Sequence, residues 1–131
     1  MARNKNKLWL IILITLILLT IVGIMYIYQE HRDIKTESPV FVLTSGVLIQ
    51  QFSSNTSESE KKYLDKVIEV SGIISHIDGN SLTLNDKLFC LLQNPVPNII
   101  INTSTKVKGR CIGYDDLLQE VKLDQCIIIN N

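Results

Sequence analysis

Two hydrophobic patterns divide this chain of 131 residues. The stretch from Leu8 to Tyr28 holds no charged residue, whereas apolar and polar residues alternate in short runs from Lys66 onward. As a helix, the first stretch spans about 31 Å, close to the thickness of the hydrocarbon core of a bilayer. Trp9 near one end and Tyr26 near the other suit the aromatic belts of a membrane interface. The pattern predicts a transmembrane helix over residues 8–28.

This helix is better explained as a retained anchor than as a cleaved signal peptide. A signal peptide has an apolar core of roughly 7 to 15 residues, followed by small residues at the cleavage site, and the sole alanine of the chain is Ala2. More basic residues precede the helix than follow it, which favours a cytoplasmic amino terminus. They are Arg3, Lys5 and Lys7 before it, and Arg32 and Lys35 after it. We therefore expect a cytoplasmic basic flank (1–7), a single-pass helix (8–28), a tether (29–43) and an extracytoplasmic domain (44–131).

The domain is expected to open with one or two short helices. Leu48 and Phe52 lie four residues apart, which places them on one helical face, and Thr44 precedes them as a candidate N-cap. Asn55 followed by Glu58 resembles a capping box for a second helix, which would run to about Tyr63 with Ser59 on its inner face. The alternative for this second piece is a flexible serine-rich loop.

Five strands are expected after the helices. The turn signal from Asp78 to Asn80 separates the first two, Gly72 supplies a bend, and Pro95 and Pro97 make Gln93 to Thr105 irregular. The expected strands are Lys66–Ser75, residues 81–84, residues 88–92, Lys106–Tyr114 and Glu120–Ile129. This order predicts a mainly β domain, a five-stranded Greek-key barrel of the oligonucleotide/oligosaccharide-binding (OB) type.

Two stretches, FSSNTSESEKKYLDKVIEVSG and VKGRCIGYDDLLQEVKLDQC, resemble the tRNA_anti-like family of bacterial OB-fold proteins, which often carry an amino-terminal membrane segment. The similarity covers about Thr44 to Ile129. The matching positions are Leu48, Phe52, Asn55, Lys62, Tyr63, Val67, Ile68, Glu69, Val70, Gly72, Gly109, Cys111, Gly113, Leu123 and Cys126. The lysine-rich, glycine-ended turn usual before the fourth strand is replaced here by the stretch with Pro95 and Pro97. The resemblance implies the OB fold, and the name of the family implies a possible nucleic-acid ligand.

The charge distribution argues against a polyanionic ligand. Residues 36–131 carry eight basic and eleven acidic side chains, a net charge of −3, while binding to phosphates needs clustered Lys and Arg. A small basic stripe of Lys106, Lys108 and Arg110 alternates along the fourth strand, and Tyr114 is the candidate stacking platform beside it. The alternative is an ordinary solvated strand face. We expect Phe89 to lie in the core.

The three cysteines and two histidines do not form a metal motif. Cys111 and Cys126 lie on the last two predicted strands, so a disulfide between them is possible in an oxidising compartment; the alternative is reduced thiols that fill the core. Cys90 with His76 as its base is a weak candidate for catalysis, because apolar residues flank Cys90 in a buried strand. We expect neither metal, cofactor nor enzymatic activity.

These features predict a membrane-anchored OB-fold binding module. The first hypothesis is that it contacts a protein or an oligosaccharide partner in the cell envelope. The second is a single-stranded nucleic-acid binder that uses Lys106, Lys108, Arg110 and Tyr114. The third is a structural spacer in a membrane assembly.

Overall fold

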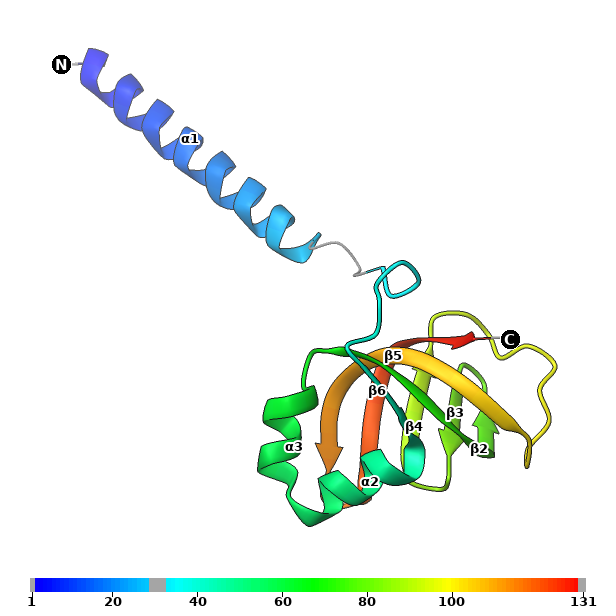
Figure 1. Ribbon diagram of the computed structural model, residues 1–131. Helices are drawn as coiled ribbons and strands as arrows, with labels where there is room; N and C mark the ends of the chain where they lie inside the picture. Colours follow the sequence, from blue (N-terminus) through cyan, green and yellow to red (C-terminus); the bar gives the residue numbers. More distant parts are fainter. Residues whose placement is uncertain (1, 29–32, 130–131) are drawn as a thin grey trace. The chain divides into compact units, whose positions relative to one another are not determined.

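The computed structural model describes residues 2–28 and 33–129, which belong to two separate compact units divided after Arg32 (Figure 1). Residues 29–32, which belong to the predicted tether, lie outside the described residues. Arg32, one of the basic residues counted after the helix, is among them.

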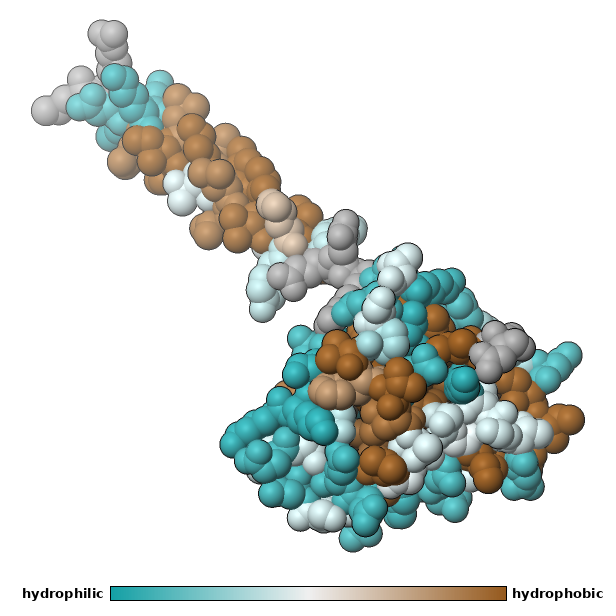
Figure 2. Space-filling model, viewed as in Figure 1, coloured by the Kyte–Doolittle hydropathy of each residue, from teal (hydrophilic) through white to brown (hydrophobic). Residues whose placement is uncertain are grey.

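The first unit is one helix, α1 (Ala2–Ile27). Its large apolar side chains from Leu8 onward are all exposed, and Figure 2 shows them covering most of its length, with polar side chains at the amino-terminal end. The hydroxyls of Thr15 and Thr20 donate to the carbonyls of Ile11 and Ile17, so they are satisfied within the helix. The helical stretch Asn4–Ile27 contains an 18-residue window with a mean hydropathy of 3.0 and is long enough to cross a membrane. An apolar helix that could serve as a membrane anchor is therefore present where the sequence places it.

The second unit contains a six-stranded sheet, of which five strands close into a barrel. The strands are β1 (Phe41–Thr44), β2 (Val67–Asp78), β3 (Ser81–Leu84), β4 (Leu88–Leu92), β5 (Ser104–Asp115) and β6 (Glu120–Ile129). Around the barrel the order is β2, β3, β4, β6, β5 and back to β2. The β4–β6 pair is parallel and the other barrel pairs are antiparallel. This topology confirms the predicted OB-type barrel.

Two capped helices precede the barrel, as the sequence predicts. They are α2 (Ser45–Ser54) and α3 (Thr56–Tyr63). At the start of α2 the Thr44 hydroxyl accepts a hydrogen bond from the Val47 amide, at 3.4 Å. At the start of α3 the Asn55 side chain accepts one from the Glu58 amide, at 3.2 Å. The alternative of a flexible serine loop is wrong. Ser59 is buried beside Tyr63 on the inner face of α3.

Strand β1 is a structural element that the sequence analysis placed in the tether. It pairs in parallel with β2, with Phe41 opposite Ile68 and Thr44 opposite Ser71. The preceding segment is also part of the domain, because Ile34 is fully buried. The prediction of a tether is therefore wrong from residue 33 onward, because this part of the chain is folded against the barrel. Four residues are too few to show a strand period in the sequence.

The core lies inside the barrel and under the two helices. Its buried members are Leu48, Phe52, Tyr63, Ile68, Val70, Ile74, Leu82, Leu84, Leu88, Cys90, Leu92, Val107, Cys111, Val121, Leu123 and Cys126. Gly72 serves a close approach: a Cβ there would collide with the side chains of Ser45 and Asn85. The side-chain oxygen of Asn85 also accepts a hydrogen bond from the Ile73 amide, at 3.1 Å, which fastens the β3–β4 turn to β2.

Candidate ligand-binding face

The basic stripe predicted on β5 exists, but the chain itself uses most of its charge. Lys106, Lys108 and Arg110 all lie half-buried on the outer face of the strand. The Lys108 ammonium donates to the backbone carbonyls of Lys35 and Glu37, both at 3.0 Å, so the segment before β1 lies across this face. A stripe whose central lysine is bound to backbone carbonyls is not an open surface for phosphates.

Arg110 is the second member of the stripe with internal partners. Its guanidinium donates two parallel hydrogen bonds to the Asp124 carboxylate, at 2.9 and 2.6 Å, and it contacts Asp65 at 3.5 Å. The hydrogen bond to Asp124 is the main cause that raises the pKa of Arg110 above its usual value, and burial opposes it. Two carboxylates therefore neutralise this cation.

The predicted stacking platform, Tyr114, faces the core. A bulge between Cys111 and Gly113 adds a residue to β5, and Tyr114 is then paired with the inward-facing Val121. Such an insertion exchanges the two faces of a strand. The Tyr114 ring is stacked on Phe52 with a centroid separation of 5.8 Å, and the prediction of an exposed platform is wrong.

Phe89 is the aromatic residue on the outer face of the barrel. In β4 the side chains of Leu88, Cys90 and Leu92 are buried, while Phe89 is half-buried between them. Its assignment to the core is therefore wrong. The alternation within the sequence LFCLL carries the signal, since residues 88, 90 and 92 already form one apolar face.

The register of four strands places Phe89 in a row of polar groups. His76 on β2 is opposite Thr83 on β3, Thr83 is opposite Phe89 on β4, and Phe89 is opposite Lys122 on β6. Directly paired residues project from the same face. The Lys122 ammonium lies 6.0 Å from the centroid of the Phe89 ring, within range of a cation–π interaction. We call His76, Thr83, Phe89 and Lys122 the outer row.

The β5–β6 turn at one end of the outer row is held in a fixed shape. The Asp115 carboxylate accepts hydrogen bonds from the amides of Leu117 and Leu118, at 3.0 and 3.1 Å, and from the Lys122 ammonium at 3.1 Å. The Leu118 amide is the main cause that lowers the pKa of Asp115, followed by Lys122. Leu117 is 95 % exposed at the tip of this ordered turn. At the opposite end of the face, the β2–β3 turn contains Gly79 and Asn80.

The outer row can bind a ligand by stacking and hydrogen bonding. It combines one accessible aromatic ring, an imidazole, a hydroxyl and an ammonium. In barrels of this type the face of the second and third barrel strands, here β3 and β4, and the turns at its two ends bind oligonucleotides and oligosaccharides. Residues 33–129 carry nine basic and twelve acidic side chains, a net charge of −3, so the field around this face is not that of a polyanion site.

Cys111 and Cys126, the pair for which a disulfide was considered possible, are not bonded to each other in the structure. Cys90, Cys111 and Cys126 are all buried and free. The register places Cys111 opposite Leu123, three positions before Cys126 on β6, so the two thiols are not paired across the strands. Burial raises the pKa of Cys111 to about 11. The alternative of reduced thiols that fill the core fits what the structure shows for this residue.

The structure does not bring together a catalytic pair or a metal site among its described residues. Cys90 is buried within the barrel, whereas His76 is exposed on the outer row. Within residues 2–28 and 33–129, no group of three or more His, Cys, Asp or Glu side chains could hold a metal ion.

The strand order and the two preceding helices define an OB-type barrel, and the outer row lies on its surface. A family model for the tRNA_anti-like family matches residues 1–118, and the chain belongs to this family. Among proteins with curated descriptions, none matches the chain significantly.

The barrel is also similar to a solved structure described as a "putative nucleic acid-binding lipoprotein" from Klebsiella pneumoniae. The two chains are 14 % identical with a TM-score of 0.52, over 78 % of this chain and 100 % of the other. At this identity the likeness shows the fold alone.

Proposed function

We propose that this protein is a membrane-anchored binding module without enzymatic activity of its own, whose outer row contacts a protein or an oligosaccharide of the cell envelope. The observation that carries the proposal is the row formed by His76, Thr83, Phe89 and Lys122 across four strands. Its aromatic ring and hydrogen-bonding groups suit sugar rings or the side chains of a partner protein.

The charges near this face support an uncharged or basic ligand over a polyanion. Asp78 ends β2 at one side of the face, and Asp115 ends β5 at the other, with Asp116 next to it in the turn. Carboxylates at both ends would repel a phosphate backbone, while they leave a neutral glycan unaffected. Phe89 is then the expected anchor of the interface, since aromatic residues dominate binding energy in such patches.

The test uses the full chain in detergent or nanodiscs as bait for solubilised envelope proteins and as a probe of glycan arrays. A ligand recovered with the wild-type protein should bind the Phe89→Ala variant about tenfold more weakly, or worse. The matched control is Val47→Ala, which removes an exposed apolar side chain from α2. Blank arrays and a bait without partners would overturn the proposal and favour a structural spacer.

Single-stranded nucleic acid is the second candidate, and Phe89 beside Lys122 is the observation that favours it, because bases stack on aromatic rings next to cations. The description of the Klebsiella protein of similar fold as a "putative nucleic acid-binding lipoprotein" supports testing this candidate. Salt-sensitive retention of single-stranded RNA or DNA by the full chain, weakened in Phe89→Ala and Lys122→Gln but not in the Lys61→Gln control, would establish it. Absence of binding at low salt would exclude it.

For the placement, we propose that α1 is retained as a signal anchor with its amino terminus in the cytoplasm and the barrel outside. Lys5 and Lys7 before the apolar stretch favour this orientation. Carboxyl-terminal fusions to alkaline phosphatase and to green fluorescent protein distinguish the two orientations. An active phosphatase fusion supports the proposal, and a fluorescent cell with an inactive phosphatase contradicts it.

A further inference from the structure

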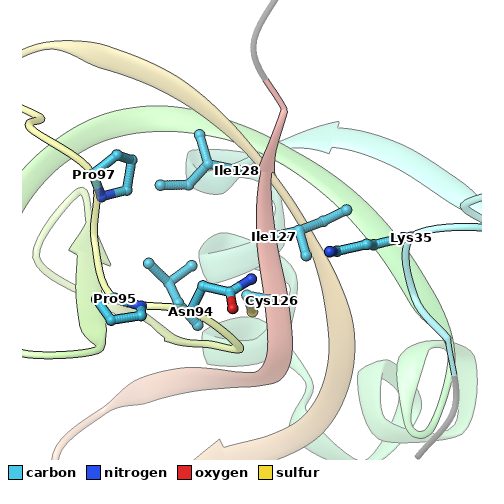
Figure 3. A pocket seen from close by; sticks show the side chains of 8 residues that line it. Lys35, Asn94, Pro95, Pro97, Cys126, Ile127 and Ile128 are labelled. Carbon is cyan, nitrogen blue, oxygen red and sulfur yellow. The ribbon is translucent and has the colours of Figure 1, made fainter.

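A cavity of about 360 Å³ lies where the end of β6 meets the loop after β4 and the segment before β1. Most of its wall is apolar, and its lining residues are Lys35, Leu92, Asn94, Pro95, Pro97, Cys126, Ile127 and Ile128. Figure 3 shows Pro95 and Pro97 on the loop and the Lys35 side chain extending towards Ile127. At about 30 Å³ for a water-sized group, the cavity holds on the order of ten non-hydrogen atoms, which suits one short chain rather than a diacyl lipid.

The apolar wall is part of the folded barrel and its loop. Leu92 on β4 is paired with Cys126 on β6, and the Gln93 amide donates to the Cys126 carbonyl at 3.0 Å, so the backbone behind the cavity is held by hydrogen bonds. On the loop side, Pro95 and Pro97 present rings and carry no backbone N–H. The space is therefore preformed, as is usual for sites that bind small molecules.

The charged member of the lining is Lys35, whose side chain is exposed. Its own backbone carbonyl accepts a hydrogen bond from the Lys108 ammonium at 3.0 Å, which fixes the segment from which the side chain extends. Within the part of the chain that the structure describes, the Lys35 ammonium has no hydrogen-bond or ion-pair partner, in contrast to the ammonium groups of Lys108 and Lys122. Asn94 adds an amide that can donate to the same ligand.

The geometry points to this cavity as a binding site for a medium-chain fatty acid, a single apolar tail that ends in a carboxylate. Removal of the tail from water onto the apolar wall supplies the affinity. The carboxylate accepts hydrogen bonds from the Lys35 ammonium and the Asn94 amide, and its charge complements that of Lys35. A cationic amphiphile of the same length would place like charges together. This site is separate from the outer row, which shares none of its lining residues.

The experiment uses the full chain in phosphatidylcholine nanodiscs with isotope-labelled isoleucine methyl groups, titrated with hexanoate and octanoate at neutral pH. Empty nanodiscs give the free concentration of each acid, and the isoleucine methyls of α1 report acid that enters the lipid. The methyl resonances of Ile127 and Ile128 should shift and saturate. Octanoate should bind about fifteenfold more tightly than hexanoate, because each additional buried methylene strengthens binding about fourfold.

The head group is tested with octanamide, which keeps the tail and removes the charge. Lys35→Gln should weaken the binding of octanoate about fivefold and leave that of octanamide unchanged. Asn94→Asp, which places a like charge beside the carboxylate, should also weaken octanoate more than octanamide. Lys61→Gln on α3 is the matched control and should change neither. All three positions are exposed, so the variants should keep the fold.

Three results would overturn the assignment. The first is the absence of a saturable shift at Ile127 and Ile128 with octanoate. The second is equal affinity for hexanoate and octanoate, since a tail outside the cavity gains nothing from its length. The third is an equal loss for octanoate and octanamide in Lys35→Gln, because a lysine that only shapes the cavity would affect both.

Discussion

The outer face of β5 and the outer face formed by β3, β4 and β6 both carry basic side chains, but they use them differently. On β5, Lys108 binds the backbone of the preceding segment and Arg110 is paired with Asp124. On the other face, Lys122 braces a turn and lies beside the accessible ring of Phe89. A basic residue in a sequence therefore does not by itself predict a cation that is open to a ligand, because the fold pairs Lys108, Arg110 and Lys122 alike with groups of the chain itself.

The largest expected effect on stability comes from truncating Tyr114, compared with the same truncation of Phe89. Tyr114→Ala removes a ring that is stacked on Phe52, so the free energy of unfolding should fall by about 3 kcal/mol. Phe89→Ala removes a half-buried ring from the outer face and should cost about 1 kcal/mol. Thermal and urea denaturation of both variants measure the difference. Equal losses would contradict the assignment of Tyr114 to the core.

Breaking the ion pair between Arg110 on β5 and Asp124 on β6 should have the next largest effect on stability. Arg110→Met leaves the Asp124 carboxylate, whose side chain is 20 % exposed, without its main partner, and we expect a loss of about 2 kcal/mol. The double variant Arg110→Met with Asp124→Leu should recover much of this loss, because it removes the unpaired charge as well. A double-mutant cycle measured by urea unfolding tests the coupling. An additive result would contradict a stabilising pair between Arg110 and Asp124.

Lys108 should have a smaller and more local effect. Lys108→Met removes two hydrogen bonds to the carbonyls of Lys35 and Glu37, and the expected cost is about 1 kcal/mol. The amides of residues 33–40 should exchange hydrogen faster, while the amides of β4 should be unaffected. Lys106→Met is the matched control on the same face. Unchanged exchange in the Lys108 variant would show that this segment is held by other contacts.

The smallest expected effect is a pH dependence of the β5–β6 turn. Because the pKa of Asp115 is lowered in the folded state, its contribution to stability is present above its usual value near 3.8 and is lost as the pH falls through the folded value. The amide resonances of Leu117 and Leu118 should therefore shift together in strong acid. Asp115→Asn should remove this titration.

The five barrel strands, the two short helices and the apolar amino-terminal helix could be read from the sequence, because each depends on local order, whereas β1 could not. The alternation of apolar residues placed the five barrel strands, and the Asn55 and Thr44 caps fixed where α2 and α3 begin. The candidate site could not be read in the same way. Tyr114 was assigned to the solvent and Phe89 to the core, but both are half-buried: Tyr114 packs on Phe52 at the core, and Phe89 lies on the outer face.

The sequence by itself determined the period of each element and the net charge, since these properties belong to neighbouring residues. Only the tertiary structure decided which side of β5 faces the core beyond Cys111, because one inserted residue at the bulge exchanges the faces. It also decided that the Lys108 ammonium meets the backbone carbonyl of Lys35, a residue more than seventy positions earlier. Such pairings arise from barrel closure, which brings together residues that no local pattern relates.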